Sequence, residues 1–86
     1  MQNATIITSR DTGPFRGKYW VRTAVKRVVP DEGESYLVAR AEIFDVPPYL
    51  GKPYRVAVGS NIRVDDVLDM MQNAERIARD TIHRFR

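Results

Sequence analysis

Residues 18–46 read KYWVRTAVKRVVPDEGESYLVARAEIFDV, and this stretch decides the fold. Its two halves, Lys18–Val29 and Ser35–Val46, are rich in β-branched and aromatic residues, which predicts two strands. The segment Pro30–Glu34 between them suits a three-residue hairpin loop, in which a type I turn is closed by Gly33 in the left-handed region. We therefore expect an antiparallel hairpin.

The length of this loop determines which residues of the hairpin lie opposite each other. A three-residue loop places Trp20 opposite Phe44 and Arg22 opposite Glu42, an aromatic pair and a pair of opposite charge. Such cross-strand pairs contribute about 0.2 to 1 kcal/mol each. A loop longer by one residue would set Val21 against Glu42, which is less favourable, so we expect the shorter loop.

The alternation of side chains along a strand assigns every residue of the hairpin to one of two faces. One face is a shallow trough of small and aliphatic side chains, formed by Val21, Thr23, Val25, Leu37, Ala39, Ala41 and Ile43. We expect a helix to lie in this trough. The opposite face is more polar and more aromatic, with Trp20, Arg22, Lys26, Val28, Tyr36, Val38, Arg40, Glu42 and Phe44.

Shorter β-prone runs flank the hairpin on both sides. Ala4–Ser9 predicts a first strand, which we expect to end in a loop over Arg10–Gly17, where two glycines and a proline occur. Val46–Pro53 predicts a loop, because its prolines lack the N–H that a central strand donates. Tyr54–Gly59 alternates apolar and other residues, which predicts a short fourth strand.

The hydrophobic period changes from two to about 3.6 from Arg63 onward, which predicts a C-terminal helix about six turns long. Its apolar stripe consists of Val64, Val67, Leu68, Met71, Ala74, Ala78, Ile82 and Phe85. We expect Asn61 as the N-cap of this helix. Asp65 and Asp66 near its start, and Arg84 near its end, would complement the helix dipole.

The composition is that of one ordinary globular domain: 86 residues, of which 43% are hydrophobic and 29% are charged. The expected fold is a single α+β domain over residues 1–86. It consists of a four-stranded antiparallel β-sheet with one long C-terminal α-helix packed on one face.

Cysteine is absent, which excludes a disulfide framework, an iron–sulfur cluster and a thiolate zinc site. The start, Met1–Ile7, lacks the charged and apolar regions of a signal peptide, and no apolar run is long enough to span a bilayer. We therefore expect a soluble, cytoplasmic protein. Its eleven arginines against three lysines suggest a GC-rich bacterial or phage genome.

No group of residues indicates catalysis, and we expect neither an enzyme nor a bound cofactor or metal. Gly13–Gly17 lacks the Lys-Ser/Thr pair of a phosphate-binding loop. His83 has no catalytic partner within one helical turn apart from Asp80. The three aspartates within residues 65–69 fit the start of a helix better than a cation site, because Mg²⁺ or Ca²⁺ needs further oxygen ligands.

Positive charge is concentrated in the first third of the chain. The net charge is +3, and Met1–Pro30 contains six basic residues against one acidic residue. Such an excess can steer an anionic partner toward the domain. It can equally be a solvated edge that keeps the domain soluble, and the sequence leaves both interpretations open.

The sheet face opposite the helix is the candidate binding surface. The predicted partner-binding residues are Trp20, Arg22, Lys26, Tyr36, Arg40, Phe44 and, from the following loop, Tyr49. Three interpretations are open. The first strand or the Pro47–Pro48 loop folds over this face, or the face forms a homodimer or holds another protein, or it stacks the bases of a single-stranded nucleic acid.

We favour a protein partner, because aromatic residues and arginine are enriched at protein interfaces. The expected function is that of a small non-catalytic binding module, such as an inhibitor, adaptor or accessory protein, acting as a homodimer. The alternative is sequence-tolerant binding of single-stranded nucleic acid, against which Glu42 and the modest net charge count. We expect no membrane and no small-molecule substrate among the partners.

Overall fold

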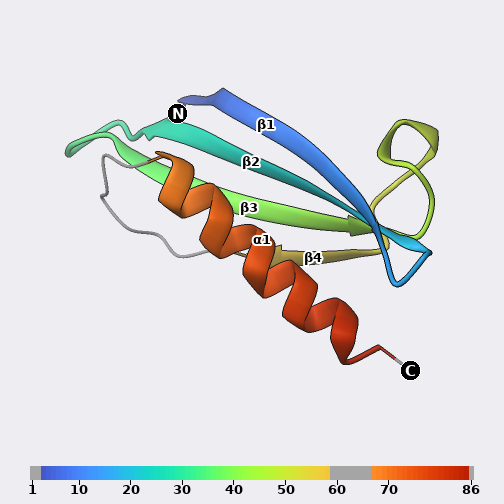
Figure 1. Cartoon of the computed structure of the whole chain (residues 1–86). Helices are drawn as coiled ribbons and strands as arrows, with labels where there is room; N and C mark the ends of the chain where they lie inside the picture. Colours follow the sequence, from blue (N-terminus) through green and yellow to red (C-terminus); the bar gives the residue numbers. More distant parts are fainter. Residues whose placement is uncertain (1–2, 59–66, 86) are drawn as a thin grey trace.

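A computed structural model shows a four-stranded antiparallel sheet with one C-terminal helix packed across one face (Figure 1). It describes residues 3–58 and 67–85. In chain order the elements are β1 (Asn3–Phe15), β2 (Tyr19–Val29), β3 (Tyr36–Phe44), a 3₁₀ turn η1 (Pro48–Leu50), β4 (Arg55–Val58) and α1 (Val67–His83). The strands lie side by side in the order β1-β2-β3-β4. The predicted α+β fold is therefore confirmed.

The central hairpin of β2 and β3 has the predicted register. Trp20 lies opposite Phe44, and Arg22 lies opposite Glu42. Gly33 has a positive φ of 96°, as predicted, but the strands end at Val29 and begin at Tyr36, so residues 30–35 lie outside them. The loop thus sets which side chains of both strands point toward the helix.

The trough of small residues on β2 and β3 receives α1, as predicted, and together they form the core. The buried residues are Val21, Val25, Leu37, Ala39, Ala41, Ile43, Ala57, Met70, Met71, Ala74, Ala78 and Ile82. Ala41, Ala74 and Ala78 are fully buried, so alanines line both sides of the contact between helix and sheet. Because alanine side chains are short, the helix can approach the strands closely.

The helix boundaries agree with the prediction where the structure describes them. The expected N-cap Asn61, the acidic pair Asp65 and Asp66, and the first predicted turn lie outside the described residues. At the other end the amide of Arg84 donates to the carbonyl of Thr81, which tightens the final turn just after His83. Among the described residues, no helix combines the length and apolar character needed to cross a membrane.

The first strand is much longer than predicted. The expected loop over Arg10–Gly17 is instead strand as far as Phe15, and residues 16–18 form the turn. The φ angles of Arg16 and Gly17 are 54° and 70°, and the amide of Lys18 donates to the carbonyl of Phe15 over 3.1 Å, as in a type I′ turn. The prediction was wrong because Gly13 and Pro14, which usually mark loops, occupy an irregularity within the strand.

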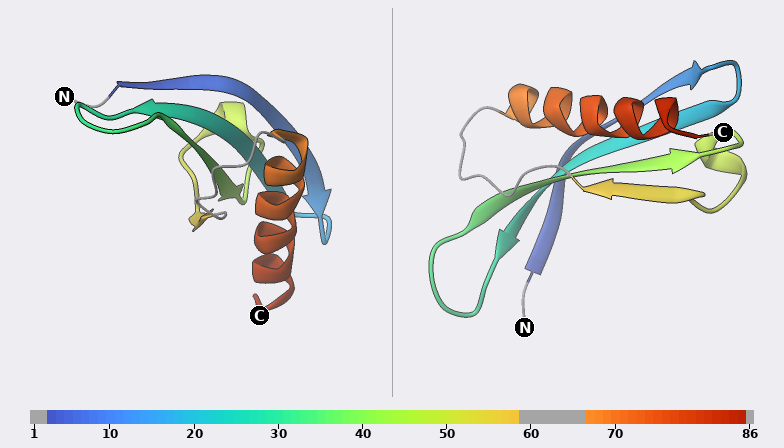
Figure 2. Two further views of the ribbon diagram at one scale, coloured as in Figure 1. Left: turned by 90° about the vertical axis from the view of Figure 1, so that its left-hand side faces the viewer. Right: turned by 90° about the horizontal axis from the view of Figure 1, so that it is seen from below.

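The far end of the sheet extends past the helix. The right-hand view of Figure 2 shows the tip of the β2–β3 hairpin reaching beyond the first turn of α1 and the start of β1 diverging from the helix, and the molecule is 43 Å along its longest axis. Ile7 and Val29 at this end are 42% and 46% exposed, and Ile6, which lies on the face turned away from α1, is 60% exposed. Apolar side chains at this end have no layer of helix above them.

Thr23 is the one residue, among those the structure describes, with a buried side-chain polar atom that has no hydrogen-bond partner. It is 1% exposed, and its hydroxyl oxygen has no hydrogen-bond partner within residues 3–58 and 67–85. Thr23→Val removes this hydroxyl and keeps the shape of the side chain. We expect it to stabilise the domain by about 1 kcal/mol, measured by urea unfolding.

Thr81→Val is the matched control for this substitution. The Thr81 hydroxyl donates to the carbonyl of Ile77 over 2.8 Å, so its removal should bring no gain. A Thr23→Val variant no more stable than the wild type would show that the hydroxyl of Thr23 has a partner after all.

Candidate functional site

The sheet face turned away from α1, called the open face below, is built of five rows of side chains that the strand pairing sets side by side. From the far end, the rows are Ala4–Val28–Tyr36, Ile6–Lys26–Val38, Ser9–Ala24–Arg40, Asp11–Arg22–Glu42–Val56 and Trp20–Phe44. The first two rows are mainly apolar, the fourth is charged and the last is aromatic. Trp20 and Phe44 thus occupy a row of their own, next to the charged row, and Arg22 lies over the Phe44 ring, 5.8 Å from its centroid.

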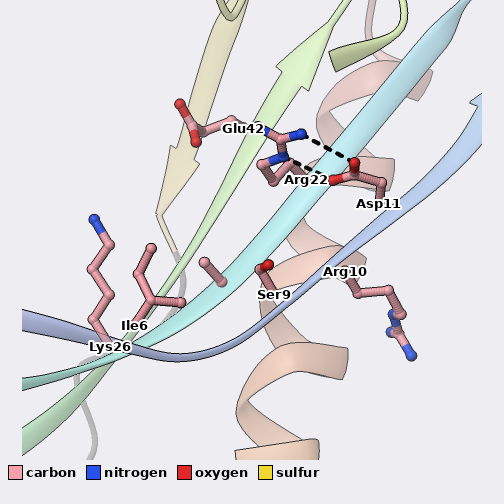
Figure 3. Close-up of a pocket in the computed structure, with 8 residues that line it drawn as sticks. Ile6, Ser9, Arg10, Asp11, Arg22, Lys26 and Glu42 are labelled. Atoms are coloured by element: carbon pink, nitrogen blue, oxygen red, sulfur yellow. Dashed lines mark hydrogen bonds and ion pairs between the residues drawn. The ribbon is translucent and has the colours of Figure 1, made fainter. Parts of the chain in front are cut away.

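The charged row joins three strands through Arg22. Its Nε donates to Oδ1 of Asp11 over 2.8 Å and its Nη2 donates to Oδ2 over 3.1 Å, which Figure 3 shows as two dashed lines. These hydrogen bonds lower the pKa of the Asp11 carboxyl below its ordinary value of 3.8 and raise the pKa of Arg22. Glu42, opposite Arg22 on β3, adds a smaller favourable charge. Arg22 is therefore engaged within its own chain.

A shallow depression of about 350 Å³ lies beside this row (Figure 3). Its lining residues are Ile6, Ser9, Arg10, Asp11, Arg22, Ala24, Lys26 and Glu42. It contains no histidine and no nucleophile with an adjacent base. Within the described residues no three His, Cys, Asp or Glu side chains come together to hold a metal ion. The depression thus offers a mixed lining of charged and apolar side chains on the open face.

The aromatic row is covered, which corrects the prediction that Phe44 is available to a partner. Phe44 is 2% exposed, and Pro48 of η1 is also buried. The segment between β3 and β4 rises from the sheet on the side away from α1 (Figure 1), and η1 contacts β2 there. The Pro47–Pro48 loop thus folds over this end of the open face, and Trp20 remains half-buried beside it.

The other predicted binding residues lie in two places. Lys26 and Tyr36 are half-buried in the first two rows of the open face, and Arg40 is exposed in the third. Tyr49 belongs to η1 and is 80% exposed. The structure therefore brings Lys26, Tyr36 and Arg40 together with Arg22, and places Tyr49 apart from them on the covering loop.

Two residues of the open face escaped the sequence analysis, Ile6 and Asp11 of β1. The register shifts between Ile6 and Thr8, so one extra residue reverses the alternation of side chains within the strand. Simple alternation therefore cannot assign both residues to the same face. Only a bulge inferred at Ile7 would have indicated that Ile6 and Asp11 both lie on the open face.

Comparison of the chain with known protein families, with curated proteins and with solved structures gave no match.

Proposed function

We propose that the chain is a non-catalytic binding module that acts as a homodimer through β1 and the adjoining apolar rows of the open face. The supporting observation is the exposure of Ile6 and Ile7, 60% and 42%, on a strand at the edge of the sheet. Among the described residues β1 pairs only with β2, so its other edge presents unpaired backbone N–H and C=O groups.

The first half of β1 lacks two of the features that usually protect an edge strand, although the irregularity between Ile6 and Thr8 interrupts its regular pairing. Asn3–Ser9 contains no charged residue and no proline, and it extends for about 20 Å as a strand. Exposed edges of this kind bind a further strand by backbone hydrogen bonds, with side chains of alternate residues in contact. The far end of the sheet is therefore suited to receive another strand.

A second copy of the chain can bind this surface. In a two-fold symmetric dimer the same strand of each copy lies at the interface, so β1 of one copy would pair with β1 of the other. Antiparallel pairing of β1 with its equivalent places uncharged segments together and joins the apolar rows around Val28 and Tyr36 of both copies. Beyond these rows the open face carries both signs of charge, with Arg40 and Lys26 near Glu42. Unlike charges can then meet across the two-fold axis.

Sedimentation of the protein between 5 and 500 µM, roughly, tests this proposal. We expect the wild type to be dimeric and Ile6→Lys to be monomeric, since a buried lysine without a partner is costly. Ile6 is largely exposed in the single chain, so its replacement should leave the unfolding transition nearly unchanged. A wild-type protein that stays monomeric throughout the range would overturn the homodimer.

Leu68→Lys is the matched control. Leu68 is also an exposed aliphatic residue, at 55%, but lies on α1. The Leu68→Lys variant should dimerise like the wild type. Equal loss of dimer in both lysine variants would mean that the effect follows from hydrophobicity or charge in general, and would contradict a role for β1.

A further inference from the structure

A second surface, remote from the open face, combines aromatic rings with cations. Three rings, those of Tyr19, Tyr54 and Phe85, contact one another near the start of β2, the start of β4 and the end of α1, and a fourth, Phe15, ends β1. The rings of Tyr19 and Phe85 are 5.1 Å apart between centroids, those of Tyr54 and Phe85 are 5.7 Å apart, and Phe15 packs against the same core. Tyr54 is 60% exposed, so part of this aromatic cluster faces solvent.

Three exposed cations lie directly on these rings. The charged groups are 5.4 Å from the ring centroid for Lys18 over Tyr19, 5.0 Å for Arg55 over Phe85 and 5.2 Å for Arg79 over Phe15. Rings hold the stems of such side chains in place and leave the charge accessible. The name basic aromatic end is used below for these six residues together with Tyr54.

The cations of the basic aromatic end have no acidic partners within residues 3–58 and 67–85, where none of the three forms an ion pair. Arg22 on the open face, by contrast, is bound by Asp11. Charges that are not neutralised by their own protein keep their full attraction for an external anion. The cations of this surface are therefore available to an external anion, whereas Arg22 in the charged row of the open face is already paired.

A fourth cation fixes the shape of this end. Nη1 of Arg16 donates to the carbonyls of Ile82 and Phe85 over 2.9 and 2.8 Å, which ties the β1–β2 turn to the end of α1. The carbonyl of Ile82 also accepts from the amide of Phe85 over 3.0 Å, so the chain just after the helix is fixed by both bonds. Phe85 and the cations around it are consequently held in place before any ligand arrives.

Three acidic residues gather at the opposite end of the molecule from the basic aromatic end. Asp31, Glu32 and Glu34 lie exposed at the tip of the β2–β3 hairpin, and the right-hand view of Figure 2 places this tip at the other extreme of the 43 Å molecule from the end of α1. A field of this polarity turns the basic aromatic end toward an approaching polyanion.

We infer that the basic aromatic end binds single-stranded nucleic acid. Lys18, Arg55 and Arg79 are placed to contact successive phosphates, and the exposed ring of Tyr54 offers a surface on which a base can stack. Aromatic rings beside unpaired cations favour a single strand over a duplex, whose bases are already stacked on one another. This inference does not depend on the homodimer, because β1 pairing and the basic aromatic end use different residues.

Fluorescence anisotropy with a fluorescein-labelled oligothymidylate of about 15 nucleotides tests the inference. Three phosphate contacts predict a log–log salt slope near −2 for the binding constant. Arg55→Glu should weaken binding at least tenfold at low salt, and Lys18→Glu, on the turn and outside the core, should do the same. Circular dichroism confirms that each variant is folded.

Arg27→Glu provides the control, because it changes the net charge equally on an exposed strand residue near the acidic tip. It should leave binding within about twofold of the wild type. Equal weakening by Arg27→Glu and Arg55→Glu would overturn the site, since only net charge would then matter. Absence of binding at low salt would overturn it too, as would binding only to vesicles of phosphatidylglycerol, which would assign this end to a lipid surface.

Discussion

Ala41→Phe is expected to destabilise the domain by roughly 3 kcal/mol, the upper part of the range for overpacked cores. Ala41 is fully buried in the middle of β3, opposite Thr23 on one side and Ala57 on the other. The helix above contributes Ala74 and Ala78, which are also fully buried. A benzyl group at residue 41 must therefore push the helix away from the sheet. The change in the urea midpoint measures the effect.

Ala24→Phe is the matched control, because Ala24 lies on β2 with its side chain on the open face. It is half-buried beside Ser9 and Arg40 and has no helix above it. We expect a change of less than about 1 kcal/mol. Equal destabilisation by the two phenylalanines would contradict the assignment of faces.

The central hairpin and the core could be predicted from the sequence because their determinants are local. The Pro30–Glu34 loop sets the register, and strict alternation then assigns residues such as Val21 and Trp20 to opposite faces without further information. The apolar residues of the helix that covers one face repeat with a different period, about 3.6 residues. Two local patterns and one loop length thus identified most of the residues buried between helix and sheet. Leu68, which the pattern placed on the apolar stripe, is 55% exposed, and Met70, which it left out, is buried.

The course of β1 could not be predicted, because irregularities hide its alternation. The register shifts between Ile6 and Thr8 and again between Thr12 and Phe15. Each register shift costs little in energy. The amino-acid composition of the segment does not distinguish such a shift from a loop. Gly13 and Pro14 are even the usual marks of a loop. The pairing of Asp11 with Arg22 therefore became visible only in three dimensions.

Whether the aromatic residues are exposed to a partner could not be predicted either, because their exposure depends on tertiary contacts. Proline at residues 47 and 48 excludes a strand but does not say to which face of the sheet the chain turns. The loop turned toward Phe44 and buried it. Likewise, Lys18, Arg55 and Arg79 come from segments far apart in the sequence, so that no window of sequence contains the basic aromatic end.

Gly13→Ala is expected to destabilise the domain by about 3 kcal/mol, because two costs add at this residue. Its φ of +133° is one that side chains rarely adopt. An added Cβ would also lie 2.9 Å from the carbonyl oxygen of Tyr19 and 3.1 Å from Cα of Trp20, both backbone atoms of the adjacent strand. Neither can move without disturbing the start of β2. Urea unfolding, extrapolated to water, measures the loss.

Gly33→Ala separates the two costs. Gly33 also has a positive φ, +96°, but a Cβ there would meet no atom of the described residues within 4 Å. We expect this variant to lose about 1 kcal/mol, from backbone strain alone. The difference between the two variants then measures the contact of residue 13 with β2. If Gly13→Ala were no less stable than Gly33→Ala, the first strand could not pass as close to Trp20 as the fold requires, and the path of β1 beyond Thr12 would have to be different.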